Sequence, residues 1–218
     1  MGAFHSVPTE DNLEDLAERT GFSLEQVKNL HRRFKYLSGG AETLRKENLE
    51  SISDLAFNPI RKQIIQAFFD KRNFGQNGAG SVQEIGFEEF LIVLANFRPP
   101  APRITEEERE TIKREKLRFL FNMHDTDNDG TITLEEYRHV VEELLSSSGA
   151  IGKETAKAIS DAAMLEVASV TVGQMRPDEF YEGITFEHFQ QILKGLDIDS
   201  KMSIRFMNVN TSNMRCGK

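Results

Sequence analysis

The chain has 218 residues, of which 39% are hydrophobic, and it contains 16 Phe, 6 Pro and no Trp. This composition favours a soluble helical protein that is long enough to bury one or two cores. The formal charge of −8 argues against a nucleic-acid-binding surface, the single Cys216 excludes an internal disulfide, and no apolar run is long enough to span a membrane.

The amino-terminal segment, residues 1–20, carries a candidate lipidation site. Its opening sequence, Met1-Gly2-Ala3-Phe4-His5-Ser6, matches the pattern for attachment of myristate to Gly2 after removal of Met1. A pattern this short also arises by chance. One acyl chain binds membranes weakly, with an association constant of about 10⁴ M⁻¹, so firm anchoring needs a second contact.

The first strongly amphipathic helix is expected to begin at Ser23, which is placed to form a capping box with Gln26. Its apolar positions recur at helical spacing, at Leu24, Val27, Leu30 and Phe34. A loop over residues 37–48 follows, and a second amphipathic segment contains Leu49 and Ile52. The pattern predicts a helix–loop–helix unit.

A second helix–loop–helix unit is predicted to begin at Asn58, with Asn58 as N-cap and Pro59 as the first helical residue. The apolar face of its entering helix is predicted at Ile60, Ile64, Ile65, Phe68 and Phe69. The exiting helix carries Phe87, Phe90, Leu91 and Leu94. Residues 99–104 are rich in proline, cannot continue a helix, and are predicted to link two halves.

The helix after this linker is predicted to start with a capping box formed by Thr105 and Glu108. Basic residues in this helix alternate with acids and are expected on a solvated face, at Lys113, Arg114 and Lys116. The same is expected of Arg32, Arg33 and Lys35 in the first unit.

A twelve-residue stretch, residues 125–136, fits a calcium loop at each ligand position. The predicted metal ligands are Asp125, Asp127, Asp129, Thr131, Thr133 and Glu136. The aspartates offer side-chain oxygens, Thr131 offers its carbonyl, and Thr133 acts through a water. Gly130 makes the sharp turn, and the two oxygens of Glu136 suit Ca²⁺, although Mg²⁺ could occupy the same anionic loop.

The flanks of this stretch distinguish it from an acidic surface turn. Apolar residues precede it at helical spacing, at Leu117, Leu120 and Phe121. Others follow it in the same way, at Tyr137, Val140, Val141, Leu144 and Leu145. A metal-binding helix–loop–helix unit is therefore predicted.

A fourth unit is predicted to begin with a helix over residues 155–167. Its apolar face is expected at Ile159, Ala163, Met164 and Val167, and residues 168–174 are interpreted as an insertion. The closing helix carries Phe186, Phe189, Ile192, Leu193 and Leu196. Residues 197–218 form a tail that could pack over a groove or complete the fourth unit.

The other three loops lack calcium ligands. The first places Leu37 and Asn48 at positions 1 and 12, and the fourth places Pro177 and His188 there. A neutral imidazole cannot replace the bidentate carboxylate at position 12. The second loop, from Asp70 to Glu89, is eight residues too long, so its acids are expected on the surface, with weak metal binding left open.

Four such units at intervals of about 40 residues form an internal repeat. A single unit leaves its apolar face exposed, so units fold in pairs that join through short β bridges. We predict an all-α fold with four helix–loop–helix units in two paired lobes, over residues 21–98 and 105–196. Leu44 should pair with Ile85, and Ile132 with Ile184.

The chain resembles the calcineurin B homologous proteins of the EF-hand superfamily over nearly its whole length, and especially the type with one intact loop. The specific segments are residues 31–35, 61–69, 116–121, 173–175, 181–187 and 201–206. The resemblance implies an adaptor that binds the cytosolic juxtamembrane helix of a plasma-membrane sodium/proton exchanger and supports its stability, surface delivery and activity. It also implies inhibition of calcineurin through the catalytic subunit.

The expected mechanism is burial of an amphipathic partner helix in an apolar groove lined by Phe, Leu and Ile, with calcium tuning the C-terminal lobe. The expected location is the cytoplasm, peripherally at the inner face of the plasma membrane, and also the nucleus. Alternatives are a calcium buffer or a calcineurin-B-like phosphatase regulatory subunit. An enzyme is not expected, because no nucleophile–base pair is evident and the five His are scattered.

Overall fold

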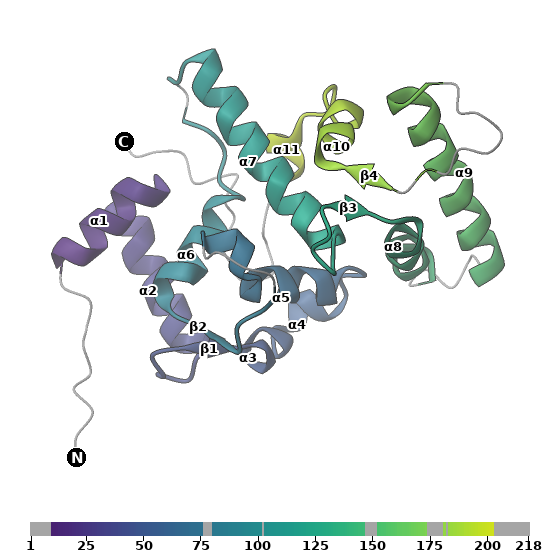
Figure 1. Cartoon of the computed structure of the whole chain (residues 1–218). Coiled ribbons are helices and arrows are strands. Elements are labelled where there is room, and N and C mark those ends of the chain that lie inside the picture. Colours follow the sequence, from purple (N-terminus) through teal and green to yellow (C-terminus); the bar gives the residue numbers. More distant parts are fainter. Residues whose placement is uncertain are drawn as a thin grey trace.

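The computed structural model describes residues 10–75, 80–101, 103–146, 152–173, 181 and 183–202 (Figure 1). Gly2, Pro177 and the tail beyond Met202 lie outside these ranges, so the predictions made for them stay predictions. The described chain is mostly helical with two short antiparallel strand pairs, which confirms the predicted all-α EF-hand fold. Within these ranges, every helix is too short or too polar to cross a membrane.

The N-terminal half contains two helix–loop–helix units preceded by an extra helix. Its elements are α1 (Glu10–Thr20), α2 (Leu24–Leu37), β1 (Leu44–Arg45), α3 (Lys46–Glu50), α4 (Ser53–Ala56), α5 (Arg61–Phe69), the 3₁₀ helix η1 (Lys71–Phe74), β2 (Glu84–Ile85) and α6 (Phe87–Ala95). The sequence did not indicate α1, which lies in the segment assigned only to lipidation and packs on α2 and α6. Its buried apolar side chains are Leu13 and Leu16.

The C-terminal half contains the third and fourth units. Its elements are α7 (Glu106–His124), β3 (Thr131–Ile132), α8 (Leu134–Ser146), α9 (Lys153–Thr171), β4 (Ile184–Thr185), α10 (Phe186–Ile192) and the short α11 (Ile198–Lys201). In Figure 1, α7 runs from the outer edge of the molecule to its centre, α8 and α9 lie together on one side, and α10 and α11 lie along α7.

Two antiparallel bridges join the loops in pairs, as the register of the loops predicted. Leu44 pairs with Ile85, and Ile132 pairs with Ile184. Next to the second bridge, Gly183 has φ 153, and a Cβ atom there would lie 2.7 Å from the carbonyl oxygen of Ile132. Only glycine lets the two loops approach this closely.

The predicted capping boxes are both present. Ser23 exchanges hydrogen bonds with Gln26 at the start of α2, and Thr105 does so with Glu108 at the start of α7. The predicted start of α5 was wrong: the side chain of Asn58 accepts from the amide of Ile60 at 3.0 Å, which makes a local turn, and the helix begins at Arg61.

Two predictions for the fourth unit were also wrong. Residues 168–171 are not an insertion, because α9 continues to Thr171 and buries Ala168 to 2% exposure. Ile159 does not lie on the buried face of this helix, since 43% of its surface is exposed. The buried residues of this helix recur every four positions instead, at Ala156, Ser160, Met164 and Ala168.

Aromatic side chains form most of the core. In the N-terminal half the ring of Phe34 packs edge-on against that of Phe90 at 5.5 Å. In the C-terminal half Phe121 contacts Phe186 at 5.6 Å between ring centroids. The rings of Phe97, just after α6, and Phe119, on α7, meet at 5.2 Å, so one continuous apolar cluster joins the two halves.

Lys116 contradicts the expectation that the basic residues of α7 are solvated. Its side chain is buried, and its Nζ atom donates to the carbonyl oxygen of Arg98 at 2.7 Å and forms an ion pair with Asp199. Ile198 and Met202, on either side of Asp199, are buried as well. The segment 198–202 is therefore held against α7 by both charge and apolar contact.

Candidate metal centre

The loop from Asp125 to Glu136 connects the end of α7 to the start of α8. Asp125 is the C-cap of α7, and its amide donates to the carbonyl oxygen of Phe121 at 2.9 Å. Asn128 and Gly130 adopt left-handed backbone conformations, with φ 63 and φ 92, which wrap the chain back on itself. Strand β3 then fixes the second half of the loop against β4.

The wrapped loop brings three carboxylates together. Asp125, Asp127 and Glu136 each offer an oxygen within 4.8 Å of the others, and among the described residues no other such cluster of acidic, His or Cys ligands occurs. The Oδ1 atom of Asp125 is buried and has no hydrogen-bond partner within the protein. A buried carboxylate oxygen needs compensation, so this atom is suited to bind a divalent cation.

The remaining predicted ligands lie around this cluster. Asp129 lies outside the three-carboxylate group, and its Oδ1 accepts from both the amide and the hydroxyl of Thr131 at 2.7 Å. Thr133 donates from its amide to Oε2 of Glu136 at 3.0 Å. The other oxygen of Glu136 accepts from the amide of Thr126 at 2.6 Å, so this carboxylate closes the loop from its far end.

The surroundings change the acidity of these carboxyl groups in opposite directions. Burial raises the pKa of Asp125 above its ordinary value, although Arg72 nearby acts against this. Burial also disfavours the ionised form of Glu136, but the hydrogen bonds from Thr126 and Thr133 outweigh it and lower the pKa. The hydrogen bonds from Thr131 lower the pKa of Asp129. Bound calcium would stabilise all three carboxylates in the ionised form.

The interrupted second loop uses its acids for contacts within the protein. Asp70 accepts from Arg72, and Glu89 caps α6 by accepting from the amide of Gly86 at 2.9 Å. Glu84 forms an ion pair with Arg45 across the strand bridge at 2.5 Å. These carboxylates do not converge, so the described part of this loop does not form a metal site.

The fourth loop places His188 beside Tyr181, with 3.3 Å between the tyrosine hydroxyl and Nδ1. Three ligand groups do not meet there among the described residues, and the interpretation of His188 as structural stays a prediction. In the first loop Glu42 forms an exposed ion pair with Lys35 of α2 at 2.5 Å.

Sequence reasoning missed Arg72, which contacts the candidate metal loop from the second unit. Its Nη1 atom donates to Oδ2 of Asp125 at 3.0 Å and to the side chain of Asn128 at 2.8 Å. Arg72 lies beside Asp70 in a loop that lost its ligands, and nothing in the local sequence indicates a partner 53 positions away.

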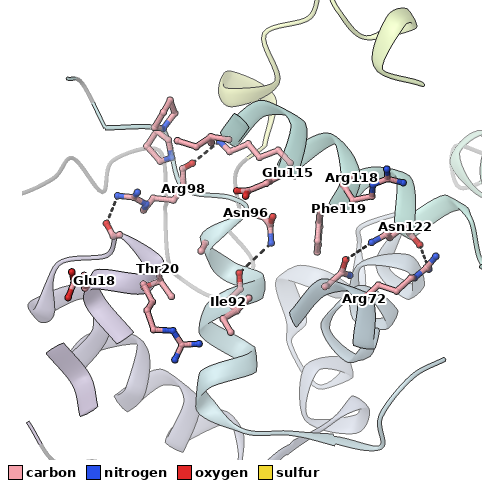
Figure 2. Close-up of a pocket in the computed structure, with 18 residues that line it drawn as sticks. Glu18, Thr20, Arg72, Ile92, Asn96, Arg98, Glu115, Arg118, Phe119 and Asn122 are labelled. Atoms are coloured by element: carbon pink, nitrogen blue, oxygen red, sulfur yellow. Dashed lines mark hydrogen bonds between the residues drawn. The ribbon is translucent and has the colours of Figure 1, made fainter. Parts of the chain in front are cut away.

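Two cavities lie along the seam between the halves, and neither is the apolar groove of Phe, Leu and Ile that the sequence predicted. The first, about 570 Å³, lies between the ends of α1, α6 and α7 and includes charged residues such as Arg98, Glu115 and Arg118 (Figure 2). The second, about 920 Å³, lies between α5 and α8, and Asp127 and Glu136 of the candidate metal loop are among the residues that line it.

Exposed apolar side chains are instead more numerous in the described part of the C-terminal half. Only Tyr36 and Phe57 are large, apolar and exposed among the described residues of the N-terminal half. In the C-terminal half the corresponding residues, here termed the C-terminal apolar surface, are Leu144, Ile159, Leu165, Val170, Val172, Ile192 and Leu196. Three of them, Ile159, Leu165 and Val170, lie on α9, and Leu165 is the most exposed of the seven at 70%.

Comparisons with known proteins agree with the geometry. Residues 116–144, which contain the second half of α7, the loop and most of α8, match the model of the EF hand domain. Calcineurin B homologous protein 3 of Xenopus tropicalis is 56% identical to this chain, covering 97% of this chain and 98% of the relative. The human protein of that name is 54% identical over the same shares. Calcineurin B of Naegleria gruberi is 30% identical, covering 94% of this chain and 99% of the relative.

Proposed function

This chain belongs to the calcineurin B homologous protein family. We propose that it is an adaptor for a plasma-membrane sodium/proton exchanger and that calcium binding to its loop regulates it. The partner element is an amphipathic helix in the cytosolic juxtamembrane part of the exchanger. Binding of this helix supports the stability, surface delivery and activity of the exchanger. The protein acts by binding and has no catalytic role of its own.

The observation that carries this proposal is the C-terminal apolar surface. Seven large apolar side chains are exposed on α8, α9 and α10 or within four residues after them, against two in the described N-terminal half. An amphipathic helix recognises such a surface through apolar residues at helical spacing. Leu165, the most exposed of them, would be covered by the partner.

Calcium binds the loop through Asp125, Asp127, Asp129, Thr131, Thr133 and Glu136, and Mg²⁺ can occupy it at rest. The convergence of Asp125, Asp127 and Glu136 supports this ligand set. Sensor loops of this kind bind calcium with dissociation constants of about 10⁻⁷ to 10⁻⁵ M. The ion would draw Glu136 toward Asp125, and α8, which begins at Leu134, would move with it.

Attachment of myristate at Gly2 would supply the second membrane contact and place the protein at the inner face of the plasma membrane, with other copies in the cytoplasm and nucleus. The likeness to calcineurin B of Naegleria gruberi supports a second activity, inhibition of calcineurin by competition for its catalytic subunit. A calcium buffer is a weaker alternative, because a single convergent carboxylate cluster in the described chain gives little capacity.

A synthetic peptide of the exchanger's juxtamembrane helix tests the binding surface. Leu165→Glu should weaken peptide binding by about tenfold or more, because it places a charge at the centre of the apolar contact. Phe57→Glu is the matched control: Phe57 is 90% exposed but lies in the N-terminal half, so peptide affinity should stay within about twofold. Isothermal titration measures both, and unchanged affinity for Leu165→Glu would contradict the proposed surface.

A further inference from the structure

Arg72 connects the second, interrupted unit to the candidate calcium loop. It lies in η1, directly after α5, and its guanidinium contacts three parts of the calcium unit. Beyond the bonds to the side chains of Asp125 and Asn128, its Nη2 atom donates to the carbonyl oxygens of Asn122 and Asp125, both at 2.9 Å. Figure 2 shows Arg72 directed at Asn122 from the neighbouring unit.

Asp70, from the same unit as Arg72, also holds the arginine side chain in place. Asp70 accepts from its Nε atom at 3.0 Å and from its Nη2 atom at 2.6 Å. The side chains of Arg72 and Asp70 are each 16% exposed, and that of Asp125 is 3% exposed. A guanidinium held by several bonds in a partly buried site is a fixed charge, and solvent screens it less than it would screen a surface lysine.

Arg72 and a bound metal would share one carboxylate. The guanidinium holds Oδ2 of Asp125, whereas the buried Oδ1 atom has no partner within the protein. A cation bound to Oδ1 would therefore lie on the other side of the same carboxylate from Arg72, a few ångströms from a permanent positive charge. Like charges at that distance repel, and Asp125 already shares its negative charge with the arginine.

We propose that Arg72 is a built-in counter-cation of the calcium loop: it lowers the calcium affinity of the loop and couples metal binding to the second unit. This inference rests on the proposed calcium site and deepens it by naming what sets its affinity. The interrupted loop therefore has a regulatory role although it has lost its ligands. Calcium bound at Asp125 would repel the guanidinium of Arg72, which belongs to the N-terminal half.

A merely structural role for Arg72 would predict the opposite effect. If the arginine served only to hold Asp125 in a binding orientation, removing it would weaken calcium binding. If its charge opposes the ion, removing the charge would strengthen binding, provided that the loop stays folded. The sign of the change therefore separates the two roles.

The test is isothermal titration of calcium into full-length protein carrying Arg72→Gln, which removes the charge and keeps hydrogen-bonding capacity. Calcium should bind about tenfold more tightly than to the wild type. Arg72→Lys keeps the charge and should stay within about threefold of the wild type. Lys71→Gln is the matched control, since it removes the same charge from the adjacent position and should change affinity by less than about twofold.

Equal or weaker calcium binding by Arg72→Gln, with native circular dichroism, would overturn the inference, as would equal tightening by Arg72→Lys. Arg72→Met removes the same charge and retains an apolar stem, so it carries the same expectation if Arg72→Gln does not fold. If the wild type binds no calcium at this loop, the proposed metal site fails. If the wild type binds calcium but neither Arg72→Gln nor Arg72→Met binds it more tightly, only this inference fails.

Discussion

Replacing Glu136 with glutamine is expected to weaken calcium binding by about 100-fold or more. Glu136 is the position-12 residue of the loop, and one of its oxygens reaches back to the amide of Thr126 at 2.6 Å. It therefore closes the loop and also supplies two of the expected metal contacts. A neutral amide keeps the size of the side chain but removes the charge on which a hard cation depends.

Isothermal titration of calcium into Glu136→Gln measures this loss. Asp125→Ala should give the same result from the other end of the loop, because it removes the buried Oδ1 atom. Glu89→Gln is the matched control: Glu89 is the expected last residue of the interrupted loop, but it caps the start of α6. If the heat of calcium binding were undiminished in Glu136→Gln or Asp125→Ala, a single site at this loop would be contradicted.

Asp199→Ala is expected to destabilise the folded protein by about 2 kcal/mol. It leaves the Lys116 ammonium, whose side chain is 2% exposed, with only the carbonyl oxygen of Arg98 as a described partner. Breaking a fully buried ion pair costs about 3–5 kcal/mol, and we expect less here because the Asp199 side chain is 29% exposed. Segment 198–202 should then detach from α7 more easily.

Urea unfolding measures this effect, and a second ion pair provides the control. Asp161→Ala breaks the Arg138–Asp161 pair, whose side chains are 30% and 37% exposed, and should destabilise the protein much less than Asp199→Ala does. Adding Lys116→Met to Asp199→Ala removes the uncompensated charge, so the double variant should be more stable than the sum of the single changes implies. Strict additivity would show that the pair does not hold the segment in place.

Local patterns predicted the helix starts and strand pairs that depend on neighbouring residues. The boxes at Ser23 and Thr105 form because a hydroxyl and a Glu or Gln three residues later satisfy each other's amides, whatever the tertiary context. The pairing of Leu44 with Ile85 follows from the fixed position of the bridge residue in each loop. The convergence of Asp125, Asp127 and Glu136 follows from the spacing of the loop.

Features that depend on tertiary contacts were not predicted. The start of α5 was missed for a local reason instead, because the side chain of Asn58 bonds to the amide of Ile60 and forms a turn before the helix. Lys116 is buried because a distant acid and carbonyl group compensate its charge, which periodicity cannot reveal. Arg72 is missed for the same reason, since its importance comes from contacts with the other half of the chain.

The most direct test of a single regulatory metal site on a binding scaffold is the number of calcium ions bound by each chain. Native mass spectrometry of the wild-type protein at saturating calcium should show one bound ion per chain, which Glu136→Gln should lose. This result would leave the other three loops as structural parts of the scaffold. Two or more specifically bound ions, or one ion retained by Glu136→Gln, would contradict it.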